Sequence, residues 1–223
     1  MQALLRLWHS TIGKKIAMAV SGILLVGFLV SHVVSNLAIF SNPEHLDAWG
    51  RFLRSTGPFL WIARAGLVAL AVIHIVAAMQ LMDRDAEARP EAYQKAGQAG
   101  SRWLALGMRA GGVLLFVFLI VHLMNLTWGS WHPAFEHGKV GQNVLVLFTL
   151  WHGMAFFYVI AMAALGLHLG HGVWSFFQTM GWNHPSWNAA RRVIAILTAV
   201  VIAGGFALIP IAVWLGWFLP TAP

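Results

Sequence analysis

IAMAVSGILLVGFLVSHVVSNLAIF, residues 16–40, is an apolar run without a charged side chain. A helix of about 20 such residues crosses the hydrocarbon core of a bilayer, so this run predicts a transmembrane helix. It is also longer than the roughly 7–15 apolar residues at the centre of a secretory signal peptide. We therefore expect it to remain in the mature protein as the first span.

Four more apolar runs of sufficient length follow the first. The chain is 59% hydrophobic and 9% charged, and its mean hydropathy is +0.73, which is typical of an integral membrane protein. A short amphipathic segment, 46–55, separates the first two runs, and 83–102 is a hydrophilic loop. The sequence predicts an all-α fold, a bundle of five transmembrane helices that forms a single membrane domain over 1–223, with spans at about 16–40, 58–82, 103–127, 144–177 and 190–218.

The basic residues predict the orientation of this bundle. The net charge of +7 is scattered over short loops, a distribution typical of topology signals and not of a nucleic-acid surface. Because cytoplasmic loops are enriched in Lys and Arg, the side of the bundle that carries most of these residues should face the cytoplasm. This places the N-terminus inside and the C-terminus outside. The basic residues on the inner side are then Arg6, Lys14, Lys15, Arg84, Arg89, Lys95, Arg102, Arg109, Arg191 and Arg192. Those on the outer side are Arg51, Arg54, Arg64 and Lys139.

The chain contains no cysteine. Disulfides, thiolate ligands and iron–sulfur clusters held by this chain are therefore excluded. Iron–sulfur chemistry, if the protein takes part in it, must come from a partner.

Histidines lie inside the first four predicted spans, one in each: His32, His74, His122 and His168. A lone intramembrane histidine is often a hydrogen-bonded packing residue, but four at matching depths predict axial ligands of two b haems. At 1.5 Å per residue, His32 and His122 lie about 24–28 Å from the inner ends of their spans, and His74 and His168 about 12–14 Å. Depth therefore pairs His32 with His122 in the outer half and His74 with His168 in the inner half.

Glycines are frequent near these histidines. They would allow a flat macrocycle to pack closely, although small residues in membrane helices more often serve helix–helix contact. The glycines concerned are Gly22, Gly27, Gly66, Gly107, Gly111, Gly112, Gly153, Gly166 and Gly170.

Two segments carry a family resemblance. STIGKKIAMAVSGILLVGFLVSHVVSNL, residues 10–37, and LGLHLGHGVWSFFQTMGWNHP, residues 165–185, resemble the two-haem, five-helix cytochrome b subunit of succinate:quinone oxidoreductases and quinol:fumarate reductases. Span number, histidine order and short loops extend the resemblance to essentially the whole chain. It implies that His74 and His168 ligate the haem nearer an iron–sulfur partner, and that His32 and His122 ligate the outer haem.

The resemblance also implies a role. Such a subunit is a multi-pass protein of the prokaryotic cytoplasmic (inner) membrane that anchors a flavoprotein subunit and an iron–sulfur subunit. Electrons from succinate would pass through the two haems to a quinone, menaquinone or ubiquinone, as in succinate dehydrogenase of the tricarboxylic acid cycle. Fumarate reduction by a quinol, the reverse direction, shares this architecture. The chain itself carries out no dicarboxylate chemistry and binds no nucleic acid.

Two further groups of residues are candidates for roles near the predicted haems, one for quinone binding and one for contact with the haem propionates. Reduction of a quinone requires hydrogen-bond donors and protons, which residues in the outer half could provide: Glu44, His45, Asp47, Arg51 and His152. For His152 a structural hydrogen bond to a neighbouring helix is an equal alternative. Haem propionates on the inner side could be neutralised or bound by Ser10, Lys14, Lys15, Arg102 and Arg109, charges that topology explains equally well.

Other functions remain open at the level of sequence. The cytochrome b anchor of a hydrogenase or a formate dehydrogenase also uses transmembrane histidines, but the even spacing of 42, 48 and 46 residues between the four histidines favours the succinate/fumarate type. A haem-free membrane transporter is the alternative from another class, because intramembrane histidines also serve in proton relays.

Overall fold

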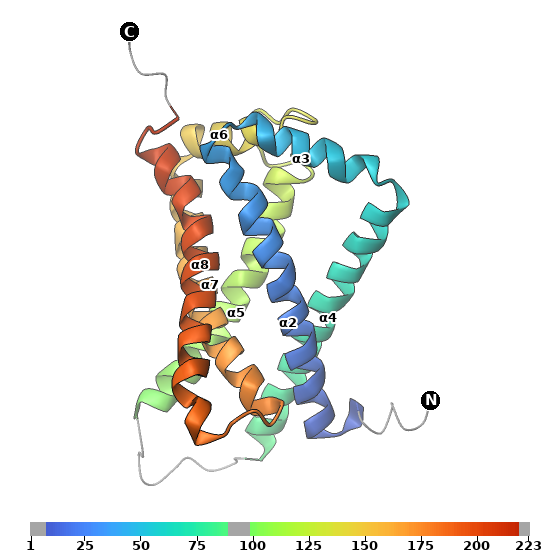
Figure 1. Cartoon of the computed structure of the whole chain (residues 1–223), viewed down its shortest axis with the longest axis vertical. Coiled ribbons are helices and arrows are strands. Elements are labelled where there is room, and N and C mark those ends of the chain that lie inside the picture. The colour runs from blue at the N-terminus through green and yellow to red at the C-terminus, as the bar shows by residue number, and fades with distance from the viewer. Residues whose placement is uncertain (1–7, 89–98, 219–223) are drawn as a thin grey trace.

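The computed structural model describes residues 8–88 and 99–218, and of residues 99–106 the backbone alone (Figure 1). In these ranges all regular secondary structure is helical, which confirms the all-α prediction. The elements are α2 (Thr11–Leu37), η1 (Ala38–Phe40), α3 (Glu44–Ser55), α4 (Pro58–Glu87), α5 (Ala99–Leu126), α6 (Val140–Leu150), α7 (His152–Thr179), η2 (Pro185–Trp187) and α8 (Asn188–Trp214).

Five of these helices, α2, α4, α5, α7 and α8, are long and apolar enough to cross a membrane. Local signals set their ends. The side chain of Ser10 caps α2 by accepting a hydrogen bond from Gly13 N at 2.9 Å. Pro58 occupies the first turn of α4 directly after Gly57, whose φ of 56° permits a tight turn from α3. The number of such helices in the described ranges agrees with the five spans that the sequence predicts.

The predicted fourth span, 144–177, is wrong in its boundaries. The structure breaks it at Trp151, whose φ of −121° and ψ of 79° lie outside the helical region. Residues before the break form the separate helix α6, which buries Val144, Leu147 and Phe148 along one face. The apolar run continues through the break without a proline, so hydropathy alone could not reveal it. The fourth membrane-crossing helix is α7.

Helices α3 and α6 lie at the same end of the bundle, which we call the capped end (Figure 1). The two helices contact each other, and Gly141 N donates a 2.9 Å hydrogen bond to Oδ1 of the buried Asp47. A Cβ at Gly141 would lie 2.2 Å from the Pro43 carbonyl oxygen, so only glycine fits this junction. The described chain begins at the end opposite the cap and finishes at the capped end.

The bundle packs unevenly. Helices α7 and α8 meet closely, because Gly166 and Gly170 of α7 face Ala203 and Ala199 of α8. These two glycines therefore serve helix–helix contact. In contrast, α4 buries only two of its thirty residues and packs mainly against α2. The four histidines lie on α2, α4, α5 and α7. One of them, His74, is therefore on the loosely packed helix α4.

Candidate functional site

The four intramembrane histidines come together as two pairs, and the pairs are those that depth predicts. The ring centroids of His32 on α2 and His122 on α5 are 6.1 Å apart, with ring planes at 87°. The centroids of His74 on α4 and His168 on α7 are also 6.1 Å apart, with planes at 63°. We call them the capped-end pair (His32 and His122) and the deep pair (His74 and His168).

Two imidazoles can lie together with a metal ion between them, through a direct hydrogen bond, or by ring packing alone, for which centroid distances of about 4.5–7 Å are usual. A metal–imidazole bond is about 2 Å long and the ring centroid lies about 1 Å further, so two rings on opposite sides of one ion have centroids about 6 Å apart. A direct hydrogen bond between the rings would reduce this distance to about 5 Å. Both pairs, at 6.1 Å, have the spacing of rings with one metal ion between them.

The chain supplies few further metal ligands. Within 8–88 and 99–218, no three or more His, Cys, Asp or Glu side chains form a group that could hold a metal ion. An ion between two imidazoles would therefore need its remaining ligands from another molecule. A porphyrin, which supplies four nitrogens in one plane and leaves two axial positions, fits this requirement.

The two pairs lie at different depths. His32 is five residues from the end of α2 and His122 is four from the end of α5, both at the capped end. His74 and His168 each lie sixteen residues into helices that start at the capped end. At 1.5 Å per residue, the two pairs are separated by about 17 Å along the bundle.

Aromatic rings surround the capped-end pair. Tyr158, which is 6% exposed, places its hydroxyl 3.4 Å from Nδ1 of His122, and the amide nitrogen of Asn36 lies 3.2 Å from Nδ1 of His32. Phe28 stacks on His32 with 5.2 Å between centroids. Phe206 and Phe118 complete the surroundings, against His32 and His122 respectively.

The deep pair has a different environment. Nδ1 of His74 lies 3.0 Å from the Met18 carbonyl oxygen and 3.3 Å from Oγ of Ser21, both on α2. Nδ1 of His168 is buried and has no hydrogen-bond partner among the described residues. A buried ring nitrogen without a partner is costly. The described residues therefore give Nδ1 of His168 no acceptor like the Met18 carbonyl oxygen that faces His74.

Space for a flat group is present beside the loosely packed helices. An added Cβ at Gly27, Gly66, Gly111 or Gly112 would meet no atom within 4 Å. A macrocycle or lipid chains can occupy this space. The two imidazoles of each pair and the open positions at these glycines are compatible with the haem that the sequence predicts.

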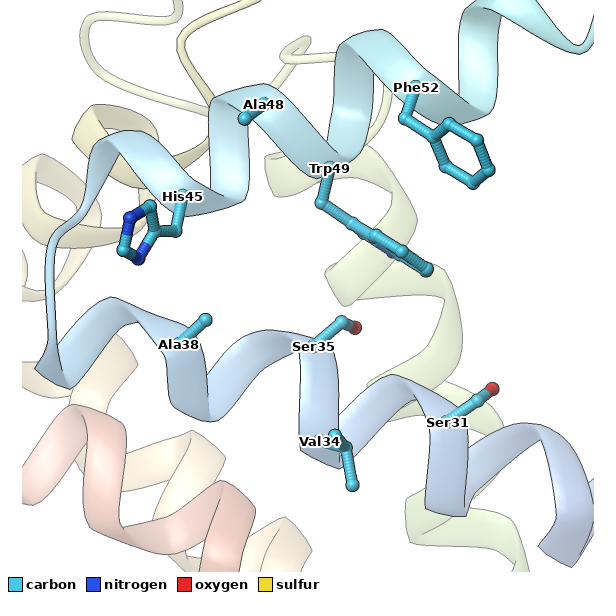
Figure 2. Close-up of a pocket in the computed structure, with 8 residues that line it drawn as sticks. All are labelled: Ser31, Val34, Ser35, Ala38, His45, Ala48, Trp49 and Phe52. Atoms are coloured by element: carbon cyan, nitrogen blue, oxygen red, sulfur yellow. The ribbon is translucent and has the colours of Figure 1, made fainter.

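A pocket of about 610 Å³ lies between α2 and α3 at the capped end (Figure 2). Ser31 and Ser35 flank His32 in sequence on the α2 side of the pocket. His45 lines it from α3, with Nδ1 2.8 Å from Oγ of Ser41. The full lining is Ser31, Val34, Ser35, Ala38, His45, Ala48, Trp49 and Phe52.

Among the five quinone candidates, His45 lines this pocket and the others do not. The carboxylate of Asp47 accepts the hydrogen bond from Gly141 N and so joins α3 to α6. Glu44 and Arg51 are exposed on α3, and His152 is the exposed first residue of α7.

The propionate candidates lie at the end opposite the cap. Ser10 is the N-cap of α2, and Lys14 is buried, its Nζ donating to the Trp8 carbonyl oxygen at 2.8 Å. Lys15 and Arg109 are exposed. The side chain of Arg102 lies outside the described residues.

Sequence reasoning missed three contacts of the histidines. Tyr158 is one of two tyrosines in the chain and lies in an apolar span, which was a usable signal. Ser21 gave a weaker signal, because serines occur throughout membrane helices. The Met18 carbonyl gave no signal, since every residue carries one.

Comparisons with protein families, with curated proteins and with solved structures find no match for this chain. The functional argument therefore stands on the histidine pairs and their surroundings.

Proposed function

We propose that this chain is the di-haem cytochrome b membrane anchor of a succinate dehydrogenase, respiratory complex II. In this role it joins a flavoprotein subunit and an iron–sulfur subunit to the membrane and connects them to a quinone. The observation that carries the proposal is the pair of 6.1 Å imidazole spacings at two depths of one membrane bundle. When bound, two b haems supply one-electron redox centres at those depths.

The residues of the chain have defined tasks under this proposal. His74 and His168 hold the haem nearer the iron–sulfur subunit, and His32 and His122 hold the other. The surrounding helices exclude water and fix the distance between the two sites. The proposed orientation, with the N-terminus inside, directs the capped end outward and the end opposite the cap toward the partner subunits in the cytoplasm.

The pocket between α2 and α3 supports a quinone site at the capped end. It is predominantly apolar, as a quinone ring requires, and it adjoins the α2 segment that carries His32. His45 can donate a hydrogen bond or a proton to a quinone carbonyl. We assign the quinone to this pocket.

A difference spectrum tests the proposal directly. We expect the purified complex, reduced with dithionite, to show a b-type α-band, and haem extraction to give two haems per copy of this chain. His137→Ala, at an exposed loop histidine, should leave both unchanged. Absence of b-type absorption from the assembled complex would overturn the electron-transfer function and favour the transporter alternative.

Filling the pocket is expected to impair quinone reduction selectively. Ala48→Trp introduces an indole into the pocket, so succinate-dependent quinone reduction should fall by at least about tenfold through displacement of the quinone ring. Both haems should remain bound, because Ala48 is on α3, which carries no member of either histidine pair. Ala63→Trp, at an exposed position on α4, is the matched control. Equal activity of the two variants would place the quinone elsewhere.

A further inference from the structure

Helix α2 takes part in both histidine pairs: it carries His32 of the capped-end pair, and its residues Met18, Ser21 and Gly22 lie against His74 of the deep pair. We propose that Met18, Ser21 and Gly22 are positioning residues for His74, which set the tautomer and orientation of its ring. This inference rests on the proposed haem function and assigns residues to the deep site that act through a ligand. Three separate contacts carry it.

The first contact sets the tautomer. A carbonyl oxygen only accepts hydrogen bonds, so Nδ1 of His74, 3.0 Å from the Met18 carbonyl oxygen, must carry the proton. In a neutral imidazole the other nitrogen, Nε2, then holds the free lone pair that a metal ion requires. A carbonyl oxygen has two lone pairs, so the Met18 carbonyl can accept this bond and also keep its bond within α2.

The second contact comes from Ser21, which is 2% exposed. Its hydroxyl donates to the Ala17 carbonyl oxygen at 2.7 Å, so the proton of Oγ is directed back along α2. The oxygen itself lies 3.3 Å from Nδ1 of His74 and can accept from the same N–H that the Met18 carbonyl binds. The Nδ1 proton of His74 therefore lies between two acceptors on one helix.

The third contact is steric. A Cβ at Gly22 would lie 3.1 Å from Cε1 and 3.3 Å from Nδ1 of His74, closer than nearly all real Cβ contacts. The ring of His74 thus lies close to the α2 backbone, and an alanine at this position would require the ring to shift. Gly204, an exposed position on α8, has no atom within 4 Å of an added Cβ. The two glycines provide a matched comparison of a position that touches the ligand and one that does not.

The contacts also have an electronic consequence. Donation of the Nδ1 proton to oxygen acceptors makes a coordinated imidazole more basic, and a more basic axial ligand stabilises ferric iron. Loss of one acceptor should therefore raise the midpoint potential of the haem at the deep pair. The capped-end pair, which has other neighbours, should not change.

Gly22→Ala and the control Gly204→Ala test the steric contact in the assembled complex. The deep component is identified as the one that His168→Ala removes. We expect Gly22→Ala to lose this component or to shift its α-band and midpoint potential in a redox titration, with the other component unchanged. Gly204→Ala should match the parent protein. An unchanged deep component in Gly22→Ala, or an equal effect of the two substitutions, would overturn the proposal.

Ser21→Ala tests the polar contact without adding an atom, Ser21→Thr is its hydroxyl-retaining counterpart, and the two decide the matter if Gly22→Ala does not assemble. Ser21→Ala should keep two haems and raise the midpoint potential of the deep component, while Ser21→Thr, which keeps the hydroxyl, should restore it. Equal potentials in the parent and Ser21→Ala would exclude Ser21 as a positioning residue. A parent complex without haem would instead refute the proposed function, so the two failures are distinguishable.

Discussion

Replacement of His74 by alanine is expected to remove the same haem as replacement of His168, and replacement of His32 or of His122 to remove the other. A low-spin haem between two imidazoles loses its site when either axial ligand is lost. The 6.1 Å spacing within each pair and the separation of the pairs along the bundle make each loss selective. Each single substitution should therefore reduce the haem content from two per chain to one.

The experiment compares reduced-minus-oxidised spectra and extracted haem for the four single variants. His152→Ala is the control, because His152 is exposed at the start of α7 and belongs to neither pair. The double variant His74→Ala/His168→Ala should lose no more haem than either single variant, since both residues serve one site. If His32→Ala and His74→Ala abolished the same spectral component, the pairing would be wrong.

The pairing of the histidines was predictable because it depends on depth alone. A helix rises by a constant 1.5 Å per residue, so the position of His32 or His122 within an apolar run converts directly into distance across the membrane. The five spans were predictable for a related reason, since the thickness of the bilayer sets a minimum length for each apolar run. Neither inference requires knowledge of which helices are neighbours.

Contacts that depend on neighbouring helices were not predictable. Asp47 was a quinone candidate because it has a polar side chain in a predicted outer loop. In the structure its carboxylate accepts a hydrogen bond from Gly141 N, which is 94 residues away in the sequence. The break at Trp151 follows from the packing of α6 across the capped end, while the sequence there continues as one apolar run. The pocket between α2 and α3 exists because α3 folds back over the end of α2.

His32→Ala is expected to uncouple succinate oxidation from quinone reduction. Loss of His32 should remove the haem of the capped-end pair, which lies at the same end of the bundle as the pocket that we assign to the quinone. The deep pair, about 17 Å further into the bundle, keeps both its ligands and the contacts of His74 with α2. Succinate should therefore still reduce the deep component in this variant, but quinone reduction should fall to a small fraction of the parent rate.

Two assays separate this outcome from a general loss of the complex. Succinate oxidation with a soluble artificial acceptor should survive in His32→Ala, because that chemistry belongs to the flavoprotein partner and needs only an assembled complex. The α-band of the deep component should appear on addition of succinate and should not decay when quinone is added. Normal succinate:quinone activity in this variant would mean that the quinone is reduced at the end opposite the cap, directly by the iron–sulfur partner, and that the pocket between α2 and α3 binds something else.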